Sequence, residues 1–107
     1  MKPFFDVDTI KAQGSRQSMA VHVSDRQQYV TLLQYFADRG YVWRSKLKIF
    51  PNPDSFYSYI SFFWFGKDNT QKVIARHERP LDDFLYFNFD EYAWGPQQID
   101  VSLDLLL

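Results

Sequence analysis

The 107-residue sequence contains no cysteine, only four glycines and only two histidines. Without cysteine, the chain has no disulfide framework, no thiolate nucleophile and no cysteine-ligated zinc site. The scarcity of glycine disfavours a phosphate-cradling loop, because such loops use several glycines close together. The two histidines, His22 and His77, are far apart in the sequence and lie in no catalytic motif. We therefore predict a protein that is not an enzyme and that binds no metal ion and no cofactor.

Long hydrophobic runs are also missing, although the chain is rich in apolar residues. No segment approaches the roughly 18 consecutive apolar residues of a membrane span, and the first ten residues do not resemble an export signal. Hydrophobic residues nevertheless make up 46% of the chain and aromatic residues 20%, which excludes an intrinsically disordered protein. The length suits one domain over residues 1–107, and we expect a soluble, cytoplasmic protein without membrane contact.

Positive charge is missing from the last quarter of the chain. Residues 1–80 hold all 12 lysines and arginines against 7 acids, whereas residues 81–107 hold 6 acids and no lysine or arginine. The two parts therefore have net charges of +5 and −6. Within one domain the two parts can attract each other, or they can attract a phosphate-bearing and a basic partner respectively.

The clearest local pattern predicts a helix from Asp25 to Arg39. Ser24 and Gln27 have the spacing of a capping box, which satisfies free N–H groups in the first helical turn. Apolar residues then recur every three or four positions. Gly40 follows, and glycine readily adopts the left-handed conformation that ends many helices.

Strand-like alternation surrounds this helix. Residues 19–23 precede it, and apolar and basic side chains alternate from Trp43 to Ile49, which predicts a strand with Trp43 on its buried side. Residues 1–17 have no firm period and are expected to form an arm or an edge strand. Further strands are predicted at residues 55–65, 71–76, 84–89 and 98–107, with a hairpin turn at residues 66–70. For residues 84–89 a short helix is the alternative.

The order of these elements predicts the fold class. One strand is followed by one helix and then by several strands, which is typical of an α+β domain. We therefore expect one main helix packed on a curled, mainly antiparallel sheet of about five strands.

The segment SFYSYISFFWF, residues 55–65, is apolar on both faces of the predicted strand. The main helix can cover one face, and a C-terminal segment that includes Phe84 and Tyr86 can cover part of the other. The face that carries Tyr57 and Tyr59 has a second interpretation, because a tyrosine can keep its hydroxyl in water and is common at interfaces.

Basic side chains are expected to flank that tyrosine-bearing face. Such a face can stack bases on its rings and hold phosphates with its cations, as single-strand binders do. Outward lysines also simply keep sheets from aggregating, so nucleic-acid binding is the alternative rather than the preferred function. The residues of this alternative site are Arg44, Lys46, Lys48, Tyr57, Tyr59, Lys72 and Arg76.

A resemblance to known proteins lies at the exit of the predicted helix. The run LLQYFADRGYVWRS, Leu32 to Ser45, resembles a pattern of two leucines, an aromatic residue and Gly-Tyr-x-Trp-x-Ser found in small proteins encoded by bacteriophages and other mobile elements. The usual glycine after this pattern is replaced by Lys46. The resemblance implies an inhibitor of a host or defence protein, as anti-CRISPR proteins are, that works by binding in the cytoplasm of a bacterial host.

The acidic C-terminal quarter fits such an inhibitor. Carboxylates can take the place of phosphates in a basic cleft, and aromatic rings can act as anchors. Adjacent acids on a strand point to opposite faces, so neither the pair Asp82 and Asp83 nor the pair Asp90 and Glu91 forms a metal site by itself. The acids can also be a solvated edge, and a homodimer can cover an exposed aromatic face. The predicted partner-binding residues are Asp82, Asp83, Phe87, Asp90, Glu91, Tyr92, Trp94, Asp100 and Asp104.

Overall fold

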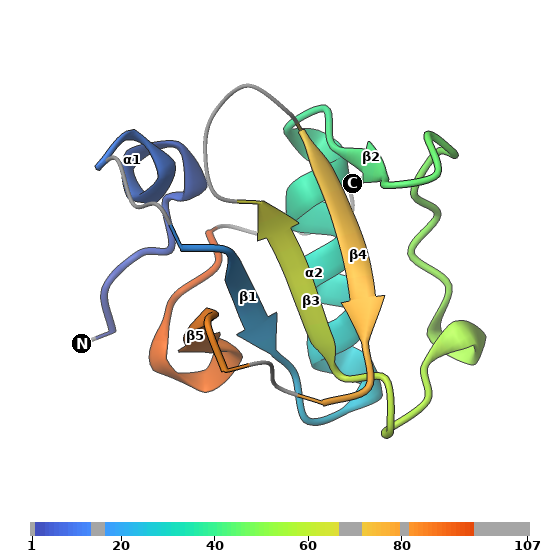
Figure 1. Cartoon of the computed structure of the whole chain (residues 1–107). Helices are drawn as coiled ribbons and strands as arrows, with labels where there is room; N and C mark the ends of the chain where they lie inside the picture. The colour runs from blue at the N-terminus through green and yellow to red at the C-terminus, as the bar shows by residue number, and fades with distance from the viewer. Residues whose placement is uncertain (1, 14–16, 67–71, 80–81, 96–107) are drawn as a thin grey trace, which may run out of the picture.

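The computed structural model describes residues 2–13, 17–66, 72–79 and 82–95 and confirms an α+β fold with one main helix. α2 is the main helix, and five strands form one sheet. In Figure 1, α2 lies behind β3 and β4. The elements are α1 (Val7–Ala12), β1 (Met19–His22), α2 (Arg26–Asp38), β2 (Val42–Trp43), η1 (Pro53–Ser55), β3 (Phe62–Gly66), β4 (Val73–His77), β5 (Leu85–Asn88) and η2 (Phe89–Glu91).

The sheet is mixed and open, so the expected curled and mainly antiparallel sheet is wrong. The strand order is β2-β4-β3-β1-β5. The inner pairs β1–β3 and β3–β4 are antiparallel, whereas the outer pairs β1–β5 and β2–β4 are parallel. The direction of β2 follows from α2, which carries the chain back after β1, and β5 runs in the same direction as β1 and β4. β2 and β5 therefore join the sheet as parallel outer strands.

Local signals define α2 at both ends. The N-cap is Asp25, not Ser24, because the Asp25 carboxylate accepts a hydrogen bond from the Gln28 backbone N–H at 2.9 Å. At the other end, Gly40 has a φ of +84° and its N–H donates to Ala37. The Tyr41 N–H donates to Phe36, and this pair of bonds is the Schellman arrangement that ends a helix at glycine. Gly40 thus ends the helix as predicted.

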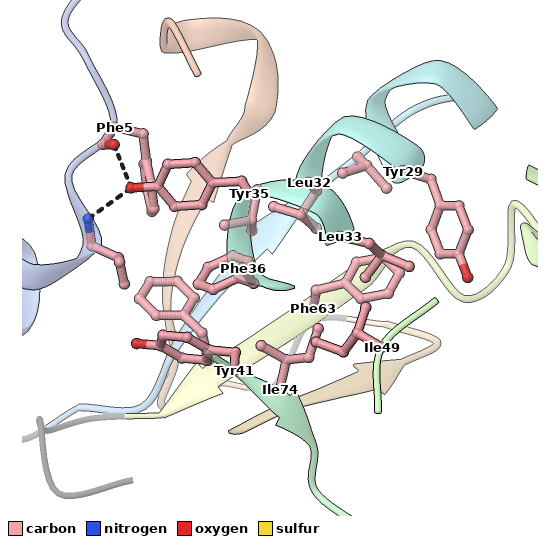
Figure 2. Packing of buried hydrophobic residues seen from close by; sticks show 14 of the residues in the cluster. Phe5, Tyr29, Leu32, Leu33, Tyr35, Phe36, Tyr41, Ile49, Phe63 and Ile74 are labelled. Carbon is pink, nitrogen blue, oxygen red and sulfur yellow. Dashed lines mark hydrogen bonds between the residues drawn. The ribbon is translucent and has the colours of Figure 1, made fainter. Parts of the chain in front are cut away.

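The core lies between α2 and one face of the sheet (Figure 2). Tyr29 and Phe36 of α2 contact Phe63 and Phe65 of β3, with ring centroids 5.6 Å apart in both pairs. All four side chains are almost fully buried. The odd-numbered side chains of β3 therefore face α2, and the even-numbered Phe62 and Trp64 lie on the opposite face.

The N-terminal segment contributes a helix and a core residue, and one parallel bridge joins Phe4 to Ala93. Phe5 is fully buried, and the Tyr35 hydroxyl holds the segment by donating to the Phe5 carbonyl at 2.6 Å and accepting from the Val7 N–H at 3.1 Å (Figure 2). Lys11 of α1 is also buried and donates to the Tyr41 hydroxyl at 2.9 Å. Residues 2–13 are thus part of the packed structure.

The predicted strand from Trp43 to Ile49 is wrong beyond Trp43. The Trp43 N–H donates to the Leu47 carbonyl, and the Lys46 N–H donates to the Trp43 carbonyl, so the chain turns sharply. Lys46 has a φ of +76°, which no alternation of side chains can reveal. Ile49 is buried as predicted, whereas Leu47 is exposed and Trp43 is only partly buried against the core.

The predicted strand at residues 55–65 is also shorter than expected. η1 and a turn closed by the Ile60 N–H and the Tyr57 carbonyl occupy its first half, so Tyr57 and Tyr59 lie outside the sheet. β3 and β4 are antiparallel neighbours, as a hairpin turn between them requires, but residues 67–71 lie outside the described part of the chain. The predicted strand at residues 98–107 lies outside it as well.

Candidate interaction surfaces

Exposed carboxylates lie at both ends of β5, the outer strand on one side of the sheet. Asp82 and Asp83 precede the strand, and Asp90 and Glu91 follow it in η2. We call these four residues the acidic edge surface. β5 has four residues, so at roughly 3.3 Å per residue it places about 13 Å of strand between the two pairs. No lysine or arginine occurs in residues 82–95, so all the side-chain charge of this described segment is negative.

The aromatic residues predicted to accompany these acids pack inward instead. Phe87, Tyr92 and Trp94 are partly buried and surround Phe5, with ring centroids 5.7, 5.3 and 4.4 Å from its ring. Trp94 also stacks on Phe89 and donates its indole N–H to the Phe89 carbonyl at 3.0 Å. These rings hold the N-terminal and C-terminal parts of the described chain together. Asp100 and Asp104 lie outside the described residues.

One member of the acidic edge surface is held in place by α2. The Gln28 side-chain amide donates to the Asp90 carboxylate at 2.5 Å, and its oxygen accepts from the Ser24 N–H at 2.7 Å. Asp90 is thereby fixed relative to the start of the helix. The sequence signal for this contact was weak, because Gln28 and Asp90 are 62 positions apart.

Exposed cations and exposed apolar side chains lie near β2, the outer strand at the other edge of the sheet. They lie on the long segment between β2 and β3, which runs outside β4 in Figure 1. Leu47 and Phe50 are 67% and 69% exposed, and Tyr57 and Tyr59 are 51% and 60% exposed. We call the following set the basic loop surface: Arg44, Lys46, Leu47, Lys48, Phe50, Tyr57 and Tyr59.

Two residues of the predicted nucleic-acid site do not join this surface. Arg76 is partly buried on the α2 side, where its guanidinium donates to the Tyr29 hydroxyl at 2.8 Å and lies 4.8 Å from the Trp43 ring centroid. It also donates to the Ser55 carbonyl at 3.3 Å. Lys72 donates to the Arg39 carbonyl at 3.3 Å. Arg76 therefore helps to fasten the loop that carries the basic loop surface.

On the face of the sheet opposite α2, aromatic side chains of neighbouring strands contact one another. Tyr86 lies edge-on to Phe62 at 5.6 Å, and Phe84 stacks on Tyr86 at 6.0 Å. Phe84 also contacts His77 at 5.8 Å. Small Ala20 pairs with both Trp64 and Tyr86 in the sheet, which leaves room for the large rings on either side.

Both histidines of this face contact aromatic rings. His22 lies 4.6 Å from the Phe62 ring, and burial lowers the pKa of His77, with a smaller contribution from the charge of Arg44. Within residues 2–13, 17–66, 72–79 and 82–95, no group of three or more histidine or acidic side chains is arranged to hold a metal ion.

Comparisons with protein-family models, with curated proteins and with solved structures find no match to this chain. None of the helices in the described ranges combines the length and the apolar content that crossing a bilayer requires. Inferences about function therefore depend on the two charged surfaces and on the contacts that hold them.

Proposed function

We propose that the protein is a non-catalytic binding module that uses the acidic edge surface to bind a basic surface of another protein. The observation that carries the proposal is the exposure of Asp82, Asp83, Asp90 and Glu91 along a described segment without any lysine or arginine. A concentrated charge of one sign raises the rate of encounter with a partner of the opposite sign. An outer strand with both ends acidic suits a partner whose basic residues lie along a cleft.

The class of partner follows from the chemistry of that cleft. Proteins that handle nucleic acids line their binding clefts with arginine and lysine, and carboxylates can occupy such a cleft in place of phosphates. Together with the resemblance at Leu32–Ser45, this favours an inhibitor of a host defence protein that targets nucleic acids, acting in the bacterial cytoplasm. The proposal rests on the carboxylates and not on the anchoring role first expected for Phe87, Tyr92 and Trp94, because those rings pack around Phe5.

Partner capture from a bacterial host lysate tests this function. The test variant is Asp82→Lys with Asp83→Lys, and the control variant is Asp38→Lys with Asp54→Lys, which reverses two exposed charges away from β5. We expect wild type and control to retain the same basic partner and the test variant to lose it. Equal retention by all three proteins would contradict the proposal.

A mass measurement by light scattering separates this function from self-association. If the acidic edge surface serves a homodimer, reversing Asp82 and Asp83 will convert a dimer into a monomer without any other protein present. We expect the isolated wild type and the variant to have the same mass.

A further inference from the structure

The exposed apolar side chains of the molecule are concentrated in one short segment. Six large hydrophobic side chains are exposed among the described residues, and four of them lie between positions 47 and 59. Three of these four are flat rings, namely Phe50, Tyr57 and Tyr59. Tyr57 and Tyr59 are also in contact in space, and large exposed apolar groups that lie together mark interaction sites in folded proteins.

Positive charge lies in the same segment. Arg44, Lys46 and Lys48 are exposed, and the Lys48 ammonium lies 5.7 Å from the centroid of the Phe50 ring. Tyr57 and Tyr59 lie side by side, with ring centroids 5.7 Å apart and planes inclined by 36°. Exposed rings next to cations are the combination with which proteins hold unpaired bases and the phosphates between them.

The structure also fixes this segment to the rest of the fold. Buried Ile49 anchors the chain between Leu47 and Phe50. Further along, Arg76 holds the Ser55 carbonyl, and Phe56 packs on Tyr29 with ring centroids 5.5 Å apart. The exposed rings are therefore presented from fixed points, which lowers the entropy lost when a ligand binds.

We propose that the basic loop surface binds single-stranded nucleic acid, with Phe50, Tyr57 and Tyr59 stacking on bases and Arg44, Lys46 and Lys48 contacting phosphates. Rings outnumber the single aliphatic side chain of this surface, which suits base stacking better than insertion into lipid. The site differs from the predicted tyrosine-bearing sheet face, because its rings lie on a loop outside the sheet. It also differs from the acidic edge surface, which lies beyond the opposite outer strand and repels a polyanion.

Fluorescence anisotropy with an oligothymidylate of about 16 nucleotides tests this site directly. At about 50 mM salt we expect a Kd of about 10 µM or tighter. The logarithm of Kd should rise by about 2 for each tenfold increase in salt concentration, as expected for three cation–phosphate contacts. The same sequence in a duplex should bind more weakly, because its bases cannot reach the rings.

Matched substitutions separate stacking from simple attraction of charge. Tyr57→Ala with Tyr59→Ala should weaken binding at least about tenfold and leave the salt dependence unchanged. Lys46→Gln with Lys48→Gln should also weaken binding but should lower the salt slope by about 1.4. The controls are Phe4→Ala, which removes an exposed ring elsewhere, and Lys2→Gln with Arg26→Gln; both should bind as wild type does.

Several results would overturn the site. They are the absence of binding at low salt, equal affinity for single strand and duplex, and an affinity unchanged by loss of both tyrosines. Binding to anionic lipid vesicles that is lost with Leu47→Ser and Phe50→Ser, without oligonucleotide binding, would assign the surface to a membrane instead. Asp82→Lys with Asp83→Lys should keep oligonucleotide binding, so this site and the proposed protein-binding function can fail separately.

Discussion

The two outer sides of the sheet differ in where they place their aromatic side chains. Next to β5 the carboxylates are exposed, whereas Phe87, Tyr92 and Trp94 pack around Phe5. On the β2 side, the segment that carries Arg44, Lys46 and Lys48 leaves Phe50, Tyr57 and Tyr59 exposed. The difference teaches that a mixture of charged and aromatic residues in a sequence does not define an interface. What matters is whether another part of the chain supplies a packing partner for the rings.

The packing around Phe5 predicts the largest effect of a single substitution. Phe5 is fully buried and contacts five other rings, so Phe5→Ala should lower the free energy of unfolding by about 3–5 kcal/mol. Denaturant unfolding measures the change. Neighbouring Phe4 is 52% exposed and provides the matched control, since Phe4→Ala should cost less than about 1 kcal/mol. Equal losses for the two variants would contradict the described packing of the N-terminal segment.

The hydroxyl of Tyr35 should have the next largest effect. Tyr35→Phe keeps the ring but leaves the buried Val7 N–H and the Phe5 carbonyl without their partner, which should cost about 1–3 kcal/mol. Tyr59→Phe removes a hydroxyl from an exposed ring and should change stability by less than about 0.5 kcal/mol. If thermal unfolding shows no difference between these variants, the N-terminal segment is not held by Tyr35.

On the opposite side, the left-handed conformation of Lys46 predicts a small gain in stability on substitution. Lys46→Gly should stabilise the fold by about 0.5 kcal/mol, because glycine takes a positive φ without the steric cost of a side chain. Lys48→Gly is the control, because Lys48 has no positive φ, and it should destabilise by about 0.5 kcal/mol through added freedom in the unfolded chain. A loss of stability in both variants would show that the turn at Lys46 carries no strain.

The smallest expected effect concerns His77. Its pKa is lowered from 6.5, first by burial and then by Arg44, so the folded chain binds a proton less readily than the unfolded chain does. Stability should therefore fall as the pH decreases from 6.5 toward the lower pKa of His77 in the folded chain. Well above pH 6.5, His77 is neutral in the folded and the unfolded chain, and its pKa shift should not affect stability. Arg44→Gln should raise the His77 pKa only slightly, since burial is the larger cause. NMR titration of the His77 ring measures both values, and an unshifted pKa in wild type would contradict its burial.

Local signals made α2 predictable from the sequence. Its periodicity and the stop at Gly40 depend on residues within a few positions of each other, and the structure confirms both, with the cap moved to Asp25. The strand after Trp43 was wrong because side-chain alternation does not report a positive φ. One available signal was overlooked: the resembling pattern has glycine at position 46, and that position has a left-handed backbone in this fold.

The candidate surfaces were less predictable because they depend on contacts between distant residues. The acids near β5 were identified from charge alone, but the inward packing of Trp94 depends on Phe5, which lies 89 positions away and in a segment without a firm period. Similarly, Arg76 alternates with apolar residues as an outward strand residue does, yet it bonds to Tyr29 of α2. Leu47 was missed because the predicted strand placed it on the buried side, and Phe50 was missed because it follows the end of that strand.

The rate of association between the captured partner and the protein tests the proposed function most directly. The rate constant should be measured for wild type, for Asp82→Lys with Asp83→Lys, and for the Asp38→Lys with Asp54→Lys control, between about 50 and 200 mM salt. We predict that wild type and control associate fast and slow down steeply as salt rises, and that the test variant associates slowly at every salt concentration. Equal rates and equal salt dependence in all three proteins would contradict a partner-binding role for the acidic edge surface.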